Sequence, residues 1–299
     1  MSPFMASVLI GDEKEGFYMR NKFQFYQLKQ RISAGSHVTP KAGYDRRRKI
    51  LDFVAWVRSL RRVRALFPVD PPFDQTPLFL DFLGLDYERA QQLAEAVCTK
   101  NDIRYSRLYS SSHFLAFASL KASGFTPKNI LEIGTGSGQT TRVLADLFPK
   151  ANVHTIELPL SDPIYGENAG GFNQEQRNQF LDLPRITAHS CNSAFMFDID
   201  LPDFDLIWLD GGHVFPEVAW DHFYCLSKLR PGGWVFTDDI RFPDNPLYRI
   251  YEGSTDAYET LAYYAKRTTH RSFFLIKRTD LHRNLFDPKY VAALHKTDT

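Results

Sequence analysis

Three aspartates stand directly after two apolar segments of the chain, where their carboxylates could bind a cation. Asp210 ends the segment FDLIWLD at 204–210, and Asp238 and Asp239 end GGWVFTDD at 232–239. Such runs are typical of buried parallel strands, and neighbouring strands lie roughly 4.8 Å apart, so the three carboxylates should converge. Three anions so close require a neutralising cation, and an all-oxygen site suits Mg²⁺, Ca²⁺ or Mn²⁺. The spacing therefore predicts a divalent-metal site, although an acidic pair is also typical of a solvated turn.

A second candidate site is the glycine-dense segment NILEIGTGSGQTTRVL at 129–144. An apolar run leads into Gly134, Gly136 and Gly138, which are followed by residues with the apolar spacing of an amphipathic helix. Glycine permits a sharp turn and lets bare backbone approach a ligand, so a nucleotide-like molecule is expected here. The dinucleotide-binding pattern reads G-x-G-x-x-G, whereas here the third glycine comes one residue early and Glu132 precedes the first. Alone, the segment is also compatible with a glycine-rich turn of another α/β fold.

The glycine segment resembles the first motif of the class I S-adenosylmethionine-dependent methyltransferases, which runs acidic-x-Gly-x-Gly-x-Gly after the first strand. The residues that match are Glu132, Gly134, Gly136 and Gly138. The resemblance implies that this loop binds the amino acid end of S-adenosylmethionine. Glu157 follows about twenty residues later, where nucleoside-binding α/β folds place a carboxylate for the ribose hydroxyls. Asn192, after the third predicted strand, matches the family position that contacts adenine, often as Asp.

The three aspartates resemble those of the metal-dependent small-molecule O-methyltransferases, which bind Mg²⁺ with an Asp after the fourth strand and an Asp-Asp or Asp-Asn pair after the fifth. Asp210, Asp238 and Asp239 match these positions, and the D-G-x-H order at 210–213 looks most like bacterial macrolide and aminocoumarin sugar O-methyltransferases. The resemblance implies that a metal-bound hydroxyl, held at Asp210, loses its proton and attacks the sulfonium methyl in line. In some of those enzymes the histidine matching His213 is the general base, and histidine exchanges protons near neutral pH. His213 could equally cap the following helix or bond a backbone carbonyl, and metal activation alone can suffice.

These residues need a parallel sheet to bring them together, and the pattern of the chain predicts one. Short β-rich runs alternate with helical segments, which is typical of a doubly wound α/β fold. The runs lie at 130–133, 152–158, 185–191, 204–210, 232–238 and 272–277. The helices are expected at 87–97, 110–123, 140–148, 215–229 and 256–266. The resemblance implies a mostly parallel, seven-stranded, Rossmann-like sheet with an antiparallel edge strand, so the seventh strand stays unassigned.

A helical extension over residues 1–100 is expected to precede a methyltransferase domain at 101–299. Residues 44–67 carry apolar side chains at three- and four-residue steps. The stripe is surrounded by Arg46, Arg47, Arg48, Lys49, Arg58, Arg61, Arg62 and Arg64. This pattern favours a helix docked on the catalytic domain or on a second subunit, and hence a homo-oligomer. The alternative is a basic helix at 46–67 on an anionic membrane surface. Prolines make residues 69–77 a linker.

Composition excludes several classes of protein. Among 299 residues, 36 Lys and Arg balance 35 Asp and Glu, which argues against a broad nucleic-acid-binding surface. Three scattered cysteines are too few for a disulfide framework or a thiolate metal site. The sequence has neither an apolar run of about 18 residues nor the features of a secretory signal, so we expect a cytoplasmic protein.

Together these features predict an S-adenosylmethionine-dependent, Mg²⁺-assisted O-methyltransferase that acts on a hydroxyl of a sugar, glycan or other small molecule. The loop at 161–172 is expected to close over a ligand, and 240–254 to wall the acceptor pocket, although both could be ordinary surface loops. One alternative is a non-catalytic methyltransferase-like scaffold, held at a membrane or in a complex by the basic helix. Another keeps the fold but changes the reaction, as in a hydroxylase or an aminopropyl transferase. It would need metal-redox ligands or an extra acidic pocket, and the sequence indicates neither.

Overall fold

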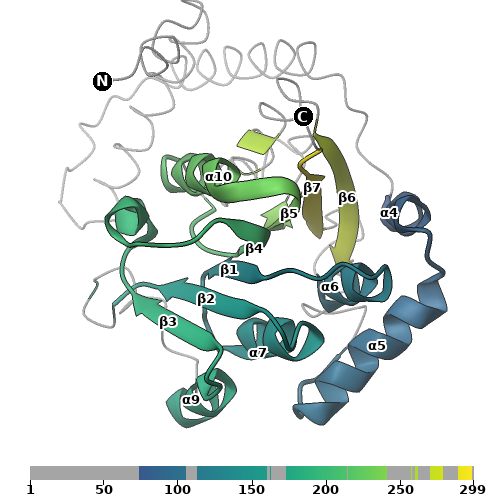
Figure 1. The fold of residues 1–299 in the computed structure, drawn as a ribbon, viewed down its shortest axis with the longest axis horizontal. Coiled ribbons are helices and arrows are strands. Elements are labelled where there is room, and N and C mark those ends of the chain that lie inside the picture. Colours follow the sequence, from purple (N-terminus) through teal and green to yellow (C-terminus); the bar gives the residue numbers. More distant parts are fainter. Residues whose placement is uncertain are drawn as a thin grey trace, which may run out of the picture. The chain divides into compact units, whose positions relative to one another are not determined.

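The computed structural model (Figure 1) describes residues 74–105, 113–159, 162, 173–213, 215–240, 257, 260–261, 270–278 and 289–297. By its internal contacts the chain divides into two units, Met1–Pro68 and Val69–Thr299, and every described residue belongs to the second. The predicted basic helix at 44–67 lies outside the described residues, as do nearly all of 161–172 and 240–254. Membrane binding, self-association and loop closure therefore stay predictions.

Seven strands form one sheet in the order β3-β2-β1-β4-β5-β7-β6 (Figure 1). They are β1 (Asn129–Ile133), β2 (Asn152–Glu157), β3 (Ile186–Ser190), β4 (Phe204–Leu209), β5 (Leu229–Ile240), β6 (Arg271–Arg278) and β7 (Lys289–His295). Strands β1 to β5 are parallel, whereas β7 runs antiparallel to both β5 and β6. This arrangement confirms the doubly wound, mostly parallel, seven-stranded sheet and matches the Rossmann-like methyltransferase fold.

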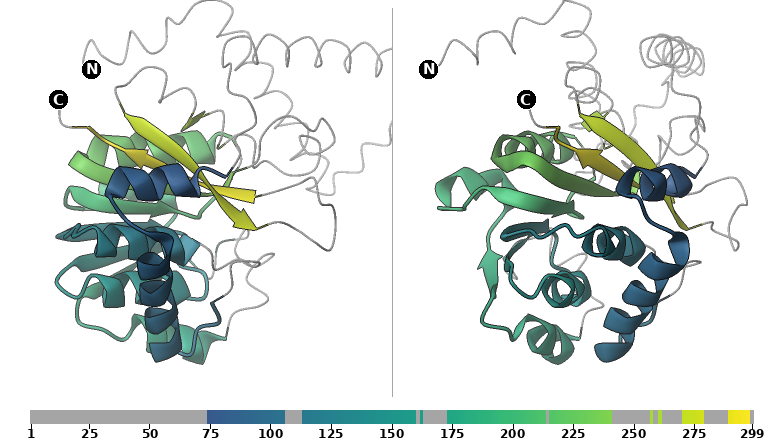
Figure 2. Two further views of the ribbon diagram at one scale, coloured as in Figure 1. Left: turned by 90° about the vertical axis from the view of Figure 1, so that its right-hand side faces the viewer. Right: turned by 45° about the vertical axis from the view of Figure 1, so that its right-hand side comes forward.

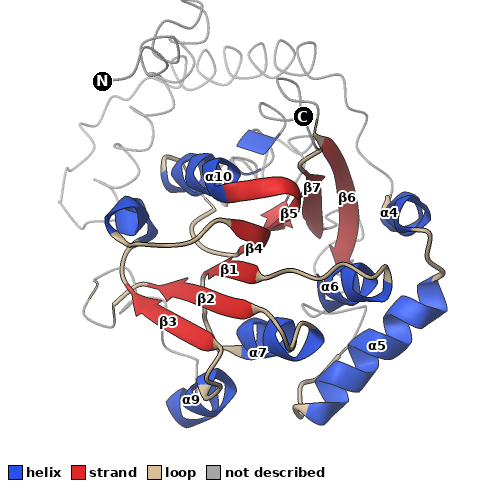
Figure 3. Cartoon of the chain, in the orientation of Figure 1, coloured by secondary structure: helices blue, strands red, loops and turns tan. Residues whose placement is uncertain are grey.

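Helices cover both faces of the sheet (Figure 1, Figure 3). The described helices are α4 (Thr76–Leu83), α5 (Tyr87–Lys100), α6 (His113–Ala122), α7 (Gln139–Leu147), α9 (Gln174–Leu181), the 3₁₀ helix η1 (Ser193–Asp198) and α10 (Glu217–Lys228). Successive strand residues point to opposite faces. Ile130 and Trp208 pack with α4 to α7 on one face, while Leu131 and Ile207 pack with η1 and α10 on the other. Among the described helices, none is both long and apolar enough to cross a membrane.

The parallel register brings the ends of the central strands level with one another. Ile133 at the end of β1 pairs with Leu209 at the end of β4, which pairs with Thr237 of β5. The backbone N–H of Asp210 also donates to the carbonyl oxygen of Ile133 over 2.8 Å. Asp210 and Asp238 come next in their strands, so the sheet itself places both at the same edge.

The seventh strand is β7, which the sequence left unassigned. Its segment KYVAALH lacks the alternation of polar and apolar residues that marks a half-buried strand, and it suits a helix equally well. Its side chains are buried on two sides, because Val291 and Ala293 belong to one core cluster, whereas Ala292 and Leu294 belong to another. Burial on both faces removes the pattern by which such a strand could be recognised.

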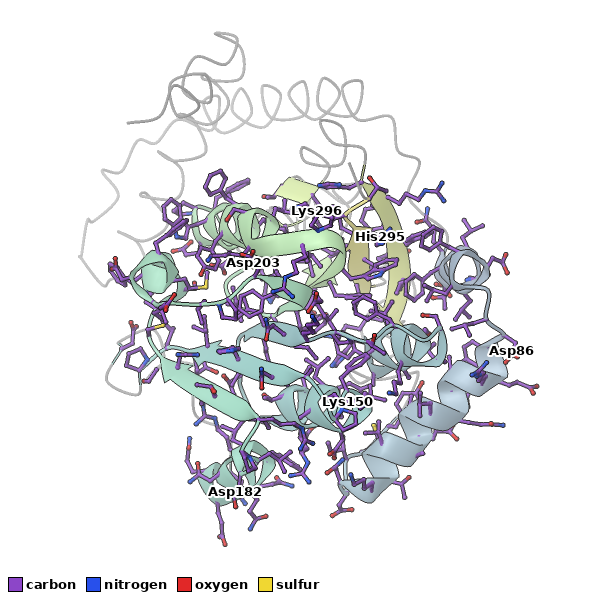
Figure 4. All side chains as sticks on the ribbon, viewed as in Figure 1. Asp86, Lys150, Asp182, Asp203, His295 and Lys296 are labelled. Atoms are coloured by element: carbon purple, nitrogen blue, oxygen red, sulfur yellow. The ribbon has the colours of Figure 1, made fainter. Side chains whose placement is uncertain are left out.

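Residues 230–233, which join the helix expected at 215–229 to the strand expected at 232–238, form the irregular first part of β5. The pairing of β5 with β4 is interrupted between Phe204 and Leu206, and Gly232 has a φ of 75°. The segment is held by the residue after β7: Gly232 N–H donates to the carbonyl of Lys296 over 2.8 Å, and Lys296 N–H to that of Gly233 over 2.9 Å. Figure 4 labels His295 and Lys296 at this end of the sheet. These two hydrogen bonds to Lys296 therefore hold the segment at the edge of the pairing between β5 and β7.

Helices α4 and α5 fall within the predicted N-terminal extension (Figure 2). The helix expected at 87–97 is α5, and Asp86 caps it by accepting a hydrogen bond from Arg89 N–H over 2.7 Å. Phe79 of α4 and Val97 of α5 lie in the same core cluster as the sheet. Two helices of the extension thus share the core of the sheet domain. Residues 1–73 lie outside the described part, and the boundary near residue 100 stays a prediction.

Candidate active site

The glycine loop follows β1 at the edge of the sheet where Asp210 lies. Gly134, Gly136 and Gly138 have φ angles of 96°, 49° and 78°, a region that residues with a Cβ rarely adopt. A Cβ atom at Gly134 would lie 2.1 Å from the carbonyl oxygen of Asp210. The first glycine is therefore required by close backbone packing between the loop and the segment after β4.

Glu132 lies beneath the glycine loop, with no exposed surface. Its Oε2 accepts hydrogen bonds from the hydroxyls of Thr141 and Thr155, the latter over 2.7 Å. Burial raises the pKa of Glu132 to about 7, against the opposing effect of these two hydrogen bonds. In this structure the carboxyl ties β1 to α7 and β2, and its predicted contact with the cofactor stays a prediction.

Glu157 is bonded directly to the glycine loop. Its Oε2 accepts a hydrogen bond from Gly136 N–H over 2.6 Å. Nε of Arg177, in α9, donates a hydrogen bond to the carbonyl oxygen of the same Gly136 over 3.0 Å. The predicted ribose-binding carboxylate and the predicted cofactor loop are thus one connected unit. Arg177, which the sequence did not single out, helps to hold it.

Asn192 lies after β3, at the start of η1. Its side-chain oxygen accepts a hydrogen bond from Ala194 N–H over 2.9 Å, so Asn192 is the N-cap of η1. The side chain is partly exposed. This capping bond explains why an amide is suited to the position, and the predicted contact with adenine stays a prediction.

Asp210, Asp238 and Asp239 do come together, as the spacing of the sequence predicts. Desolvation and the neighbouring Asp238 raise the pKa of Asp210 well above its usual range, and a hydrogen bond between the two carboxyls favours the protonated form. The side chain of Asp210 is 36% exposed, whereas that of Asp238 is only 2% exposed. Asp210 is therefore the more exposed of the two carboxyls.

The cation beside these carboxylates is a lysine that the sequence did not single out. Lys277 of β6 donates a hydrogen bond to Oδ2 of Asp238, and its Nζ lies 3.4 Å from Oδ1 of Asp239. Burial alone would lower the pKa of Lys277, but the three aspartates outweigh it and raise this pKa above its usual value. The cluster therefore contains a positive charge of its own.

Two β-bulges bring Lys277 and the aspartates together. In β5 one extra residue lies between Thr237 and Ile240, whose partners in β7 are only two residues apart. In β6 the extra residue is Lys277, because the residues on either side of it pair with consecutive residues of β7. Bulges redirect side chains beside functional sites. Asp239 also has a φ of 52°, which is strained for a residue with a Cβ and is common at such sites.

His213 lies beside Asp210, with its Nε2 3.7 Å from Oδ1 and 25% of its side chain exposed. The separation exceeds a hydrogen bond but permits electrostatic contact. The capping alternative for His213 is not supported, because α10 begins at Glu217 with Pro216 at its N-cap and no side-chain cap. The predicted base is therefore at the site, and its role stays a prediction.

A second histidine near the carboxylates, His222 of α10, was not indicated by the sequence. Its Nδ1 lies 2.6 Å from the carbonyl oxygen of Val218, and its Nε2 lies 2.9 Å from the hydroxyl of Thr237. A carbonyl can only accept, so Nδ1 carries the proton and Nε2 accepts from Thr237. Burial lowers the pKa of His222 to about 4. The neutral ring thus anchors the residue just before Asp238.

The family resemblance implies two bound groups, S-adenosylmethionine and a divalent metal, and the described residues suit the first better. Three glycines with positive φ leave the backbone of the loop bare, and Glu157 is bonded to this loop, which suits the methyl donor. The ammonium of Lys277 would compete with a divalent metal, because it already contacts Oδ2 of Asp238. Across the described residues, no group of three or more His, Cys, Asp and Glu is arranged to hold a metal ion. Metal assistance stays a prediction.

Comparison with known proteins gives one matching family. Residues 131–240 match the model of a methyltransferase domain family. Methyltransferase str2 of Strobilurus tenacellus is 28% identical over 122 residues, which make up 38% of this chain and 36% of that protein. The chain thus aligns with only about a third of this curated relative.

Several methyltransferases are among the solved structures with detectable similarity. S-adenosylhomocysteine-bound PaMTH1 of Podospora anserina is 16% identical, with a TM-score of 0.45, and the match covers 77% of this chain and 99% of that one. The O-methyltransferase TomG of Streptomyces achromogenes, in complex with S-adenosylmethionine, is 17% identical with a TM-score of 0.43, covering 75% and 97%.

The matched family region contains the candidate site almost entirely. It begins within β1, includes the glycine loop, Glu157 and Asp210, and ends at the last residue of β5. The sheet around it has the strand order and the antiparallel seventh strand described above. Residues 131–240 of the chain are therefore similar to a methyltransferase domain.

Proposed function

We propose that this protein transfers the methyl group of S-adenosylmethionine to a hydroxyl of a sugar, glycan or other small molecule. The observation that carries the proposal is the backbone contact between Gly134 and Asp210. This contact puts the predicted donor loop and the predicted acceptor residues, Asp210 and His213, at one edge of the sheet. Transfer requires donor and acceptor groups to be held a few ångströms apart and in line.

In this proposal each residue has a separate task. When bound, S-adenosylmethionine supplies an electrophilic methyl group. The acceptor oxygen forms a bond to the methyl carbon as the carbon–sulfur bond breaks, and the electron pair of that bond stays on sulfur. The hydroxyl proton moves to His213, whose Nε2 lies 3.7 Å from Oδ1 of Asp210. Glu157 and the glycine loop hold the donor.

The finer parts of the prediction rest on the family resemblance. A hydroxyl acceptor follows from the match of Asp210, Asp238 and Asp239 to the O-methyltransferase positions. Mg²⁺ assistance follows from the same three residues, but the position of Lys277 does not favour it, so no step is assigned to a metal. A cytoplasmic location and self-association complete the proposal.

Calorimetry with S-adenosylmethionine tests the donor site. Gly134→Ala places a Cβ against the Asp210 carbonyl, so it should weaken binding at least tenfold or abolish it. The matched control is Gly124→Ala, because Gly124 has a similar φ of 91° but no atom within 4 Å of its added Cβ. Absence of binding to the unaltered protein, with and without Mg²⁺, would refute the proposal.

A methyl-transfer screen separates an enzyme from a non-catalytic domain. S-adenosylhomocysteine release is measured with sugars, catechols and glycolipids as acceptors. Turnover with one hydroxyl class supports the proposal. A protein that binds the donor and releases no product with any acceptor would instead favour the scaffold alternative.

A further inference from the structure

We propose that Lys277 is the resident cation of the carboxylate cluster formed by Asp210, Asp238 and Asp239, and that it excludes a divalent metal from this edge of the sheet. Metal exclusion is a property of the cluster alone. Its catalytic consequence, methyl transfer that tolerates a chelator, rests on the proposed function.

Lys277 contacts both aspartates at the end of β5. Lys277 donates to Oδ2 of Asp238, and its Nζ lies 3.4 Å from Oδ1 of Asp239, so one ammonium contacts both aspartates of the β5 pair. A divalent ion ligated by the same pair would have to displace the ammonium or lie against it. Two cations at such a distance repel each other strongly where water is excluded.

Lys277 and Asp238 are both buried. The side chains of Lys277 and Asp238 are only 8% and 2% exposed. Charges this far from water persist when they are paired, and removing one partner leaves the other uncompensated. A lysine that is only a surface neighbour could swing away to admit a metal, but Lys277 would leave Asp238 without its counter-charge. The pair is therefore a built part of the site.

The order of the strands also fixes how Lys277 reaches Asp238. Strand β7 lies between β5 and β6, so the lysine side chain must cross one strand to reach Asp238. The bulge at Lys277 and the bulge that contains Asp238 and Asp239 occur opposite the same end of β7. Two irregularities in different strands that meet at one ion pair indicate a fixed position for the ammonium.

Manganese binding measured by electron paramagnetic resonance tests this proposal on the full chain after chelator treatment. Mn²⁺ is the probe, because its free-ion signal disappears on binding. The unaltered protein should bind no Mn²⁺ at this site. Lys277→Ala should bind Mn²⁺ at least roughly tenfold more tightly than any residual binding by the unaltered protein, since the three carboxylates then lose the ammonium beside them. Lys277→Met keeps much of the side-chain volume and serves if the alanine variant does not fold.

Two further variants identify the site. Lys277→Ala combined with Asp238→Asn should lose the gained Mn²⁺ binding. Lys100→Ala is the matched control, because it also breaks a lysine–aspartate pair, with Asp146 at 3.2 Å, but creates no cluster of carboxylates. It should bind no Mn²⁺.

Two results would overturn the proposal: Mn²⁺ binding to the unaltered protein that Asp238→Asn removes, or a folded Lys277 variant with no gained binding. Calorimetry of S-adenosylmethionine on the same samples keeps this test separate from the proposed function. Failure to bind the donor would refute the function and leave the manganese result standing. If the function holds, turnover of the unaltered protein should be unchanged in chelator, and loss of turnover there would count against the inference.

Discussion

The ammonium of Lys277 donates a hydrogen bond to Oδ2 of Asp238 across the intervening strand β7. The pair joins edge strand β6 to the end of the sheet where the candidate site lies, because Asp238 follows Thr237, at which the pairing of β4 with β5 ends. Three aspartates could not lie together in a buried edge without positive charge nearby. The fold supplies that charge from its last hairpin, which lies far away in sequence.

Glu157→Gln should weaken binding of S-adenosylmethionine by roughly tenfold. The carboxylate accepts a 2.6 Å hydrogen bond from Gly136 N–H, and hydrogen bonds to charged groups contribute about 1.5–3 kcal/mol. The amide keeps the shape and loses the charge. Calorimetry measures the change in dissociation constant. Glu175→Gln on the exposed surface of α9 is the control and should bind normally. Equal affinity for all three proteins would mean that Glu157 does not support the donor site.

His213→Gln should lower turnover by about 10²- to 10⁴-fold, the usual effect of removing a general base, while donor affinity changes little. The histidine is partly exposed, and its Nε2 lies 3.7 Å from Oδ1 of Asp210. Product release is measured with an acceptor that the screen identifies. His189→Gln, on the partly exposed strand β3, is the control. Normal turnover of His213→Gln would assign the proton to another group.

The parallel part of the sheet could be predicted because its strands are buried on both faces. Segments such as 204–209 form nearly continuous apolar runs that end in polar residues. This pattern can be recognised without knowing which strands lie beside the segment. Parallel strands end at one edge, so the convergence of Asp210 and Asp238 follows from their positions in the sequence.

Lys277 could not be predicted in the same way. Its position depends on β7, whose sequence pattern suits a helix or a strand, and on two bulges that no local pattern marks. The lysine ends an apolar strand, as the aspartates do, and that is the one signal that the sequence offered. A second role of Gly134 was also not predicted. The sequence assigns this glycine to ligand binding, whereas the structure also requires it for close packing against Asp210.

Phe117→Ala should reduce the free energy of unfolding by about 3–5 kcal/mol, the usual range for removing a fully buried phenylalanine. Phe117 has no exposed surface, and its ring packs edge-on against Trp208 and Phe236 at 5.2 Å and 5.5 Å. Urea unfolding measures the loss. Leu78→Ala, at a side chain that is 58% exposed, should change stability by less than about 0.5 kcal/mol. A small loss for Phe117→Ala would show that α6 is not fixed to the sheet by this ring.

Relative to the Glu132→Gln variant, the cofactor-free protein should lose stability as the pH rises from about 5 to 8. Burial raises the pKa of Glu132 from 4.5 to about 7, so between these values the folded protein keeps a proton that the unfolded chain has lost. Stability decreases with pH wherever the folded state binds more protons, and this shift corresponds to about 3 kcal/mol. Buried Asp221, whose pKa is also raised to about 7, should contribute in the same direction.

Urea unfolding at pH 5, 6, 7 and 8 measures the slope for the unaltered protein and for Glu132→Gln. The glutamine can still accept hydrogen bonds from Thr141 and Thr155, but it cannot ionise, so its advantage over glutamate should grow with pH. Glu175→Gln removes an exposed carboxyl and should leave the slope unchanged. If Glu132→Gln and the unaltered protein lose stability in parallel, the carboxyl beneath the glycine loop is already ionised near neutral pH, and its charge must be balanced by groups other than the two threonines.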